Sequence, residues 1–192
     1  MADKDAILVV SGLPRSGTSM MMKMLEAAGI PVVTDKLRVP DQNNPNGYYE
    51  LERVKQLKDG DFTWLENASG KVVKIISALV THLPDNHAYK VIFMQRDLLE
   101  VLASQRKMLG RLGKPEDKVS DEQMAKIYQI HLRNVEAWLT RQPNIELLYI
   151  NYNTMINDPS GPVQKVNQFL GGALDIQAML GVINKDLYRE RK

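Results

Sequence analysis

The strongest restriction on how this chain folds is an apolar run that leads through a glycine-containing turn into a helical pattern. Residues 6–10 (Ala-Ile-Leu-Val-Val) are continuously apolar, which is typical of a strand buried on both faces of a parallel sheet. The polar turn 11–19 follows, and then apolar residues recur at helical spacing up to Gly29. A buried strand that passes directly into a helix favours an α/β fold.

The same alternation continues along the chain. Further strands are expected at 72–76, 89–94 and 145–150, the last as another buried strand, and helices at 98–112, from Ser120 to about 141, and at 162–170. We therefore expect one doubly wound α/β domain over residues 1–192. Its parallel sheet should have about four or five strands, flanked by helices as in P-loop NTPases. Ligands of such folds bind beyond the carboxyl ends of the strands.

Composition excludes several classes of protein. Twenty-five basic and 23 acidic residues leave a net charge of only +2, too small for a general nucleic-acid binder. No cysteine is present, so disulfides and thiolate chemistry are excluded. No apolar run approaches the ~18 residues that span a bilayer, and the polar N-terminus lacks a signal-peptide core. We expect a soluble cytoplasmic protein without a membrane segment. No histidine pair has metal-ligand spacing, so no metal is expected.

The turn 11–19 has the features of an anion-binding loop. Gly12 and Gly17 allow the backbone to curl so that successive N–H groups face inward, and the helix that follows adds its partial positive charge. The Gly-x4-Gly spacing matches a nucleotide-triphosphate loop, but Thr18 stands where that loop has lysine. Arg15 supplies a cation instead. The alternative to an anion-binding loop is an ordinary tight turn between strand and helix that binds no ligand.

A second anion anchor is expected at the end of a later strand. Arg96 follows the run 89–94, and Ser104 lies eight residues further on, along the expected helix. An arginine at the strand end can lie back along that helix, so both side chains could hold one phosphate. Alternatively, Arg96 pairs with Asp97 or Glu100 and Ser104 is a surface residue.

Together, these two segments resemble the two cofactor motifs of the sulfotransferase family. The resemblance implies that the first loop grips the 5′-phosphosulfate of 3′-phosphoadenosine-5′-phosphosulfate (PAPS), and that Arg96 and Ser104 hold its 3′-phosphate. It also places Lys74, in the strand 72–76, near the transferred group. The implied cofactor residues of the first loop are Pro14, Arg15, Ser16, Gly17, Thr18 and Ser19. Softer similarities at 149–152, 158–159 and 169–171 extend the resemblance from about residue 6 to 172.

The sequence departs from the family pattern at three places. Ile76 stands where many cytosolic members have a histidine base, so that base is missing. The C-terminal Arg-Lys-Gly that covers the cofactor in those members has only loose substitutes, in Arg189, Arg191 and Lys192. Asn153 replaces a frequent acidic residue. With these departures, the sequence resembles a compact bacterial-type member of the family.

The missing base has several candidates. The segment 44–50 (Asn-Pro-Asn-Gly-Tyr-Tyr-Glu) is similar to a motif of bacterial and carbohydrate-type members. A carboxylate in it can act as a base if it is buried, so Glu50 is the first choice and Glu52 the second. The alternative is that Glu50 caps a helix that starts near Leu51. His82 is an outside candidate, while His131 lies inside the long expected helix.

The function expected is metal-free, in-line transfer of a sulfuryl group from PAPS to a hydroxyl or amine, leaving 3′-phosphoadenosine-5′-phosphate (PAP). Arg15 and Lys74 would stabilise charge on the departing oxygen, and Glu50 would deprotonate a small-molecule or carbohydrate acceptor. A P-loop kinase is the rival enzyme, although it needs magnesium and Lys23 is poorly placed for it. A non-catalytic nucleotide-binding protein is the other rival.

Overall fold

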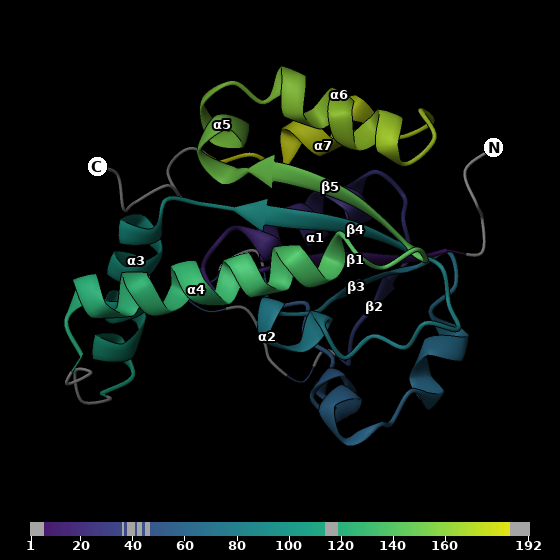
Figure 1. The fold of residues 1–192 in the computed structure, drawn as a ribbon. Coiled ribbons are helices and arrows are strands. Elements are labelled where there is room, and N and C mark those ends of the chain that lie inside the picture. The colour runs from purple at the N-terminus through teal and green to yellow at the C-terminus, as the bar shows by residue number, and fades with distance from the viewer. Residues whose placement is uncertain are drawn as a thin grey trace.

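A five-stranded parallel sheet forms the centre of the protein (Figure 1). The computed structural model describes residues 6–35, 37, 41, 44, 47–113 and 119–184. The strand order is β2-β3-β1-β4-β5. The strands are β1 (Ile7–Gly12), β2 (Val32–Val33), β3 (Val72–Lys74), β4 (Tyr89–Gln95) and β5 (Ile145–Asn151). The prediction of a doubly wound, parallel α/β sheet is confirmed.

Helices cover both faces of this sheet. Figure 1 shows α5, α6 and α7 over one face, and α2 and α4 over the other. The helices are α1 (Thr18–Ala27), α2 (Ser77–Val80), α3 (Leu98–Arg111), α4 (Asp121–Leu139), α5 (Tyr152–Asn157), α6 (Ser160–Phe169) and α7 (Ile176–Gly181), with 3-10 helices η1 (Glu52–Asp59) and η2 (Thr63–Asn67). Two apolar clusters result, one joining α1, α6 and α7 to the sheet and the other joining η1, η2, α2 and α4 to it.

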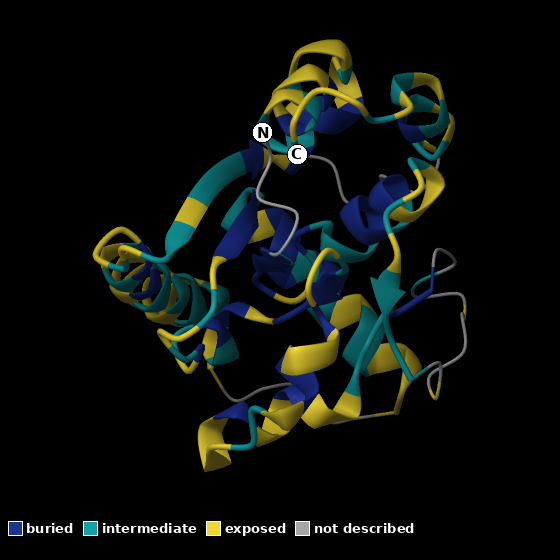
Figure 2. Cartoon of the chain, turned by 90° about the vertical axis from the view of Figure 1, so that its right-hand side faces the viewer, coloured by how far each residue is buried: buried dark blue, intermediate teal, exposed yellow. Residues whose placement is uncertain are grey.

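Burial separates the central strands from the edge strand. β4 is buried from Tyr89 to Met94, and dark blue marks the interior of the molecule in Figure 2. β5 pairs with β4 alone, and only Ile150 of its seven residues is buried. The prediction of a buried strand at 145–150 is therefore wrong in its burial, because an edge strand lacks a neighbour on one side.

Local signals set several element ends. Ser120 and Gln123 form the expected capping box, with each side chain bonded to the other residue's backbone N–H, at the start of α4. Asp97 caps α3 through Leu99 N–H and Glu100 N–H. One expected boundary is wrong, because β3 ends at Lys74 rather than at residue 76. α3 ends at Arg111, one residue before the end predicted for that helix.

The carboxyl edge of the sheet contains a topological switch point at β1. β1 pairs with β3 on one side and with β4 on the other. The loops that leave these neighbouring strands therefore run in different directions at this point. Crevices at such points are the usual ligand sites of doubly wound sheets. Within the described residues, the structure contains no helix long and apolar enough to cross a membrane.

Candidate active site

The loop after β1 is shaped by two glycines that no other residue replaces easily. Gly12 has φ +145°, and a Cβ there would lie 2.6 Å from the carbonyl oxygen of Met94. Gly17 has φ +98°, and a Cβ there would lie 2.3 Å from the ring of Tyr152. Arg15 also has a left-handed φ, of 73°, which is uncommon for a residue with a side chain. The loop is thus tightly curled and pressed against β4 and α5.

The same loop fits an anion. α1 begins at Thr18 with neither a side-chain cap nor an acidic residue in its first turn, so its partial positive charge is not offset locally. Ser16 is 1% exposed, and its Oγ has no hydrogen-bond partner among the described residues. A buried hydroxyl without a partner is costly unless a ligand satisfies it. These features suit a bound anion such as a phosphate or sulfate group.

Arg15 joins the two predicted anion motifs. Its Nε donates a 2.9 Å hydrogen bond to Ser104 Oγ on α3. Its backbone oxygen accepts a 3.0 Å hydrogen bond from Arg96 Nη1, at the end of β4. Ser104 is buried, which contradicts the surface alternative considered for it. The structure therefore brings Arg15, Arg96 and Ser104 together, and burial lowers the pKa of the Arg15 guanidinium.

Arg96 is held from two further sides. Its Nε donates to Glu100 Oε2 at 3.0 Å, and both side chains are buried. Its guanidinium carbon lies 4.5 Å from the centre of the Tyr152 ring, a cation–π contact. Asn153 Nδ2 donates to the other carboxylate oxygen of Glu100 at 2.9 Å. The expected pairing of Arg96 with Glu100 is therefore present together with, and not instead of, its contact with the loop.

Lys74 is buried at the end of β3 and lies beside Glu50. Its ammonium donates to the backbone oxygen of Tyr48 and lies 3.7 Å from Glu50 Oε1. The Glu50 side chain is 42% exposed. The burial that its predicted role as a base requires is therefore only partial. Glu50 also does not cap η1, because Leu51 occupies the N-cap position and offers no side-chain hydrogen bond.

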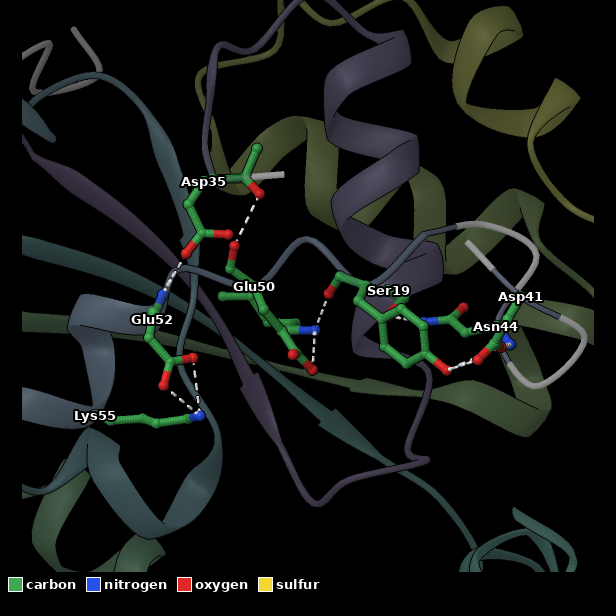
Figure 3. A network of polar contacts seen from close by, with 10 residues as sticks. Ser19, Asp35, Asp41, Asn44, Glu50, Glu52 and Lys55 are labelled. Carbon is green, nitrogen blue, oxygen red and sulfur yellow. Dashed lines mark hydrogen bonds and ion pairs between the residues drawn. The ribbon is translucent and has the colours of Figure 1, made fainter. Parts of the chain in front are cut away.

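The segment that carries Glu50 is anchored at both ends, as Figure 3 shows. Asn44 Nδ2 donates to Ser19 Oγ at 2.8 Å, which ties the segment to the start of α1. The carboxylate of Asp35 accepts from the backbone N–H of Glu52 at 2.6 Å. Glu52, the second candidate base, pairs with Lys55 at 2.7 Å on the exposed side of η1. It thus has its own partner on the surface.

A cavity of about 190 Å³ lies between the first loop, the end of β4, α3 and α4. Its walls are mainly apolar, with the polar groups of the loop and the β4 end among them. The lining residues are Leu13, Ser16, Phe93, Met94, Gln95, Arg96, Val101 and Leu132. The cavity therefore places apolar surface next to two of the predicted site residues.

One polar pair at this edge was missed by sequence reasoning. Ser77, 1% exposed, begins α2 just beyond β3, and its Oγ lies 2.9 Å from Nε2 of His131 on α4. The two residues are 54 positions apart, and nothing in their local patterns connects them. His82, the outside candidate, is exposed. Arg189, Arg191 and Lys192 lie outside the described residues, as do Pro45 and Asn46.

Comparison with known proteins identifies the family. The family model for the sulfotransferase domain matches residues 4–190, and no curated protein matches the sequence. The sulfotransferase domain of the Synechococcus PCC 7002 olefin synthase superimposes with a TM-score of 0.58 at 16% identity, covering 98% of this chain and 81% of that one. Sulfotransferase STF1 from Mycobacterium tuberculosis H37Rv gives 0.57 and 16%, covering 93% and 71%.

A third structure, retinol dehydratase in complex with androsterone and inactive cofactor PAP, gives a TM-score of 0.52 at 17% identity. It covers 95% of this chain, which spans only 65% of that protein's length. At these identities the solved structures establish the fold, whereas the family model covers nearly the whole sequence. The chain belongs to the sulfotransferase family, as the two motifs predicted.

Proposed function

We propose that this protein transfers a sulfuryl group from PAPS to a small-molecule acceptor without a metal ion. The observation that carries the proposal is the junction of the two anion motifs, in which Arg15 contacts Ser104 and Arg96 contacts the Arg15 backbone. One nucleotide with a charged group at each end would contact both motifs. Family membership supports this reading over the kinase and the non-catalytic binder.

Different residues of this chain would bind the two charged ends of PAPS. The backbone amides of the first loop and the hydroxyls of Ser16, Thr18 and Ser19 would hold the 5′-phosphosulfate. Arg96 and Ser104 would hold the 3′-phosphate, with Arg96 oriented by Glu100 and Tyr152. Pro14 and Gly17 would shape the loop.

Lys74 and Arg15 would act on the reacting group. Bound PAPS supplies an activated sulfuryl group and a phosphate leaving group. A buried ammonium such as that of Lys74 stabilises negative charge that develops nearby, because the low local dielectric strengthens the interaction. Arg15, in the first loop, would stabilise the same developing negative charge. Glu50 would contribute by holding Lys74 from the other side and is retained as a candidate proton acceptor.

The proposal is tested by following PAP release from PAPS in the presence of a metal chelator, with phenol as a probe acceptor. The wild-type protein should release PAP, and Lys74→Ala should reduce the rate by about 100-fold or more. Lys71→Ala, at the opposite end of the same strand region, is the matched control and should retain the wild-type rate. Turnover of ATP with magnesium, and none of PAPS, would instead favour the kinase.

A further inference from the structure

The proposed function lacks a well-placed proton acceptor. The family's histidine position is occupied by Ile76, which cannot take a proton. Glu50 is partly exposed and lies against the Lys74 ammonium. An acceptor hydroxyl therefore needs another group at this edge.

His131 lies at that edge although it belongs to a different element. Its partner Ser77 is three residues beyond Lys74, so their backbones are separated by at most about 10 Å. The course of the backbone is fixed here, because Ile75 N–H donates to Val10 O at 3.0 Å just after β3 ends. The 2.9 Å contact between Ser77 Oγ and His131 Nε2 places the imidazole against the residue that follows Ile76 in the chain.

We propose that His131, oriented by Ser77, accepts the proton of the acceptor hydroxyl. This proposal rests on the proposed function. With Nε2–H donating to Ser77 Oγ, the Nδ1 lone pair is the basic atom. As the acceptor oxygen bonds to sulfur, its proton moves to Nδ1, and the bond from sulfur to the bridging oxygen breaks. Its electron pair stays on the phosphate of PAP.

The surroundings of His131 keep the imidazole neutral. Burial lowers its pKa from the ordinary 6.5. One turn away on α4 lie Ile127, Tyr128, Asn134 and Val135, none of them charged at neutral pH. The segment Ser77–Val80 of α2 adds no charge. Besides His131, the titratable or charged residues of α4 are Asp121, Glu122, Lys126, Tyr128, Arg133 and Glu136. Those of α3, which packs against α4, are Glu100, Arg106, Lys107 and Arg111. Lys74 and Glu50 lie near the end of β3, and His82 follows α2.

The surface beside His131 suits an apolar acceptor. Ile76, which precedes Ser77, is 38% exposed, and Ile127, one helical turn before His131, is 52% exposed. Both elements of the Ser77–His131 pair therefore present an exposed isoleucine, which offers apolar area to the carbon skeleton of an acceptor. Phenols are therefore apt probes of this site.

The test compares two phenols, of which only one must lose a proton at the pH of the assay, and measures the loss caused by the variant separately with each. Phenol, with an ordinary pKa of about 10, is protonated at neutral pH, whereas 4-nitrophenol is already largely ionised in mildly alkaline buffer. His131→Gln retains an amide that can contact Ser77 but cannot act as a base. It should lower kcat with phenol by about 100-fold or more, and with 4-nitrophenolate by less than about 3-fold.

Further measurements separate a chemical role from a structural one. The kcat of the wild type with phenol should fall at acidic pH, because protonated His131 cannot accept a proton, and His131→Gln should lack this fall. The midpoint should lie below the ordinary histidine pKa of 6.5, because burial lowers the pKa of His131. The Tm increase of His131→Gln on binding PAP should be unchanged. His87→Gln, before β4 at the opposite edge, is the matched control and should behave like the wild type.

Two results would overturn the inference while leaving the proposed function intact. The first is an active His131→Gln protein with phenol turnover near the wild-type rate. The second is an equal loss with phenol and with 4-nitrophenolate, which would indicate a structural role. A wild-type protein that binds PAP but transfers to neither phenol, 4-nitrophenol nor water would overturn the proposed function, and with it the role of His131.

Discussion

Arg15 is the residue on which the two anion motifs converge. It lies in the first loop in a left-handed conformation and reaches Ser104 on α3. In the proposed nucleotide site, a side chain between the two anion motifs would contact the donor in the ground state and respond to charge that develops during transfer. Its position thus explains why this loop has an arginine inside it although Thr18 stands where a nucleotide-triphosphate loop has lysine.

Arg15→Ala should lower turnover of PAPS by about 100- to 1,000-fold, the usual loss when a donor to developing negative charge is removed. The matched control is Arg141→Ala, an exposed arginine beyond the end of α4, which should leave turnover unchanged. Initial rates of PAP release measure both. Near-normal turnover of Arg15→Ala would remove this residue from the catalytic machinery.

Ser104→Ala should act on binding more than on turnover. A hydrogen bond from a hydroxyl to a charged group contributes about 1.5–3 kcal/mol, so the affinity for PAP should fall by about 10- to 100-fold. Titration calorimetry with PAP measures this change, and Ser160→Ala, exposed at the start of α6, serves as the control. Unchanged affinity would exclude Ser104 from the nucleotide site.

At the scale of elements, the first loop depends on the close approach of Gly17 to Tyr152 on α5. The Tyr152 ring also lies against Arg96, so the packing of this glycine bears on both anion anchors. The loop, α5 and the end of β4 are therefore packed together, and their positions depend on one another. A change in any of them should affect the site as well as the stability.

Gly17→Ala should reduce the free energy of unfolding by more than backbone strain alone. Gly29 provides the comparison: its φ is +91°, close to the +98° of Gly17, but a Cβ there meets nothing within 4 Å. Gly29→Ala should therefore cost about 1–2 kcal/mol, for a left-handed residue with a side chain. Gly17→Ala should cost clearly more, because its Cβ overlaps the Tyr152 ring. Urea unfolding of both variants measures the difference, and equal losses would contradict it.

Sequence reasoning succeeded for elements whose own residues form a clear pattern. The apolar run before the first loop predicts β1, and Ser120 with Gln123 predicts the start of α4. It failed where the deciding contact is made between distant elements. The two-residue β2 is too short to show a pattern, and the exposure of β5 follows from its edge position, which only the strand order determines.

The same distinction applies to the site. Arg15, Arg96 and Ser104 belong to motifs whose spacing is readable, and the structure brings them together. The Ser77–His131 contact joins residues 54 positions apart, so no local pattern could indicate it. The partial exposure of Glu50 was equally hidden, because it depends on how the segment before η1 lies over β3 and α1.

At the scale of the whole molecule, the site is assembled at the carboxyl edge from both sides of the switch point. β1 and its loop contribute Arg15, β3 contributes Lys74, and β4 with α3 contributes Arg96 and Ser104. In the proposed site, no single helix or strand would hold the nucleotide. A bound nucleotide should therefore hold these elements together and stabilise the entire fold, since it binds only the native state.

The most direct test is the thermal midpoint of the wild-type protein with and without PAP, compared with ATP plus magnesium. A ligand at about 100 times its Kd adds roughly 2.7 kcal/mol, which raises the Tm of a domain this size by about 5–10 °C. We predict a rise of that order with PAP alone, undiminished by a metal chelator. A rise with ATP and magnesium only, or no rise with either ligand, would contradict the account.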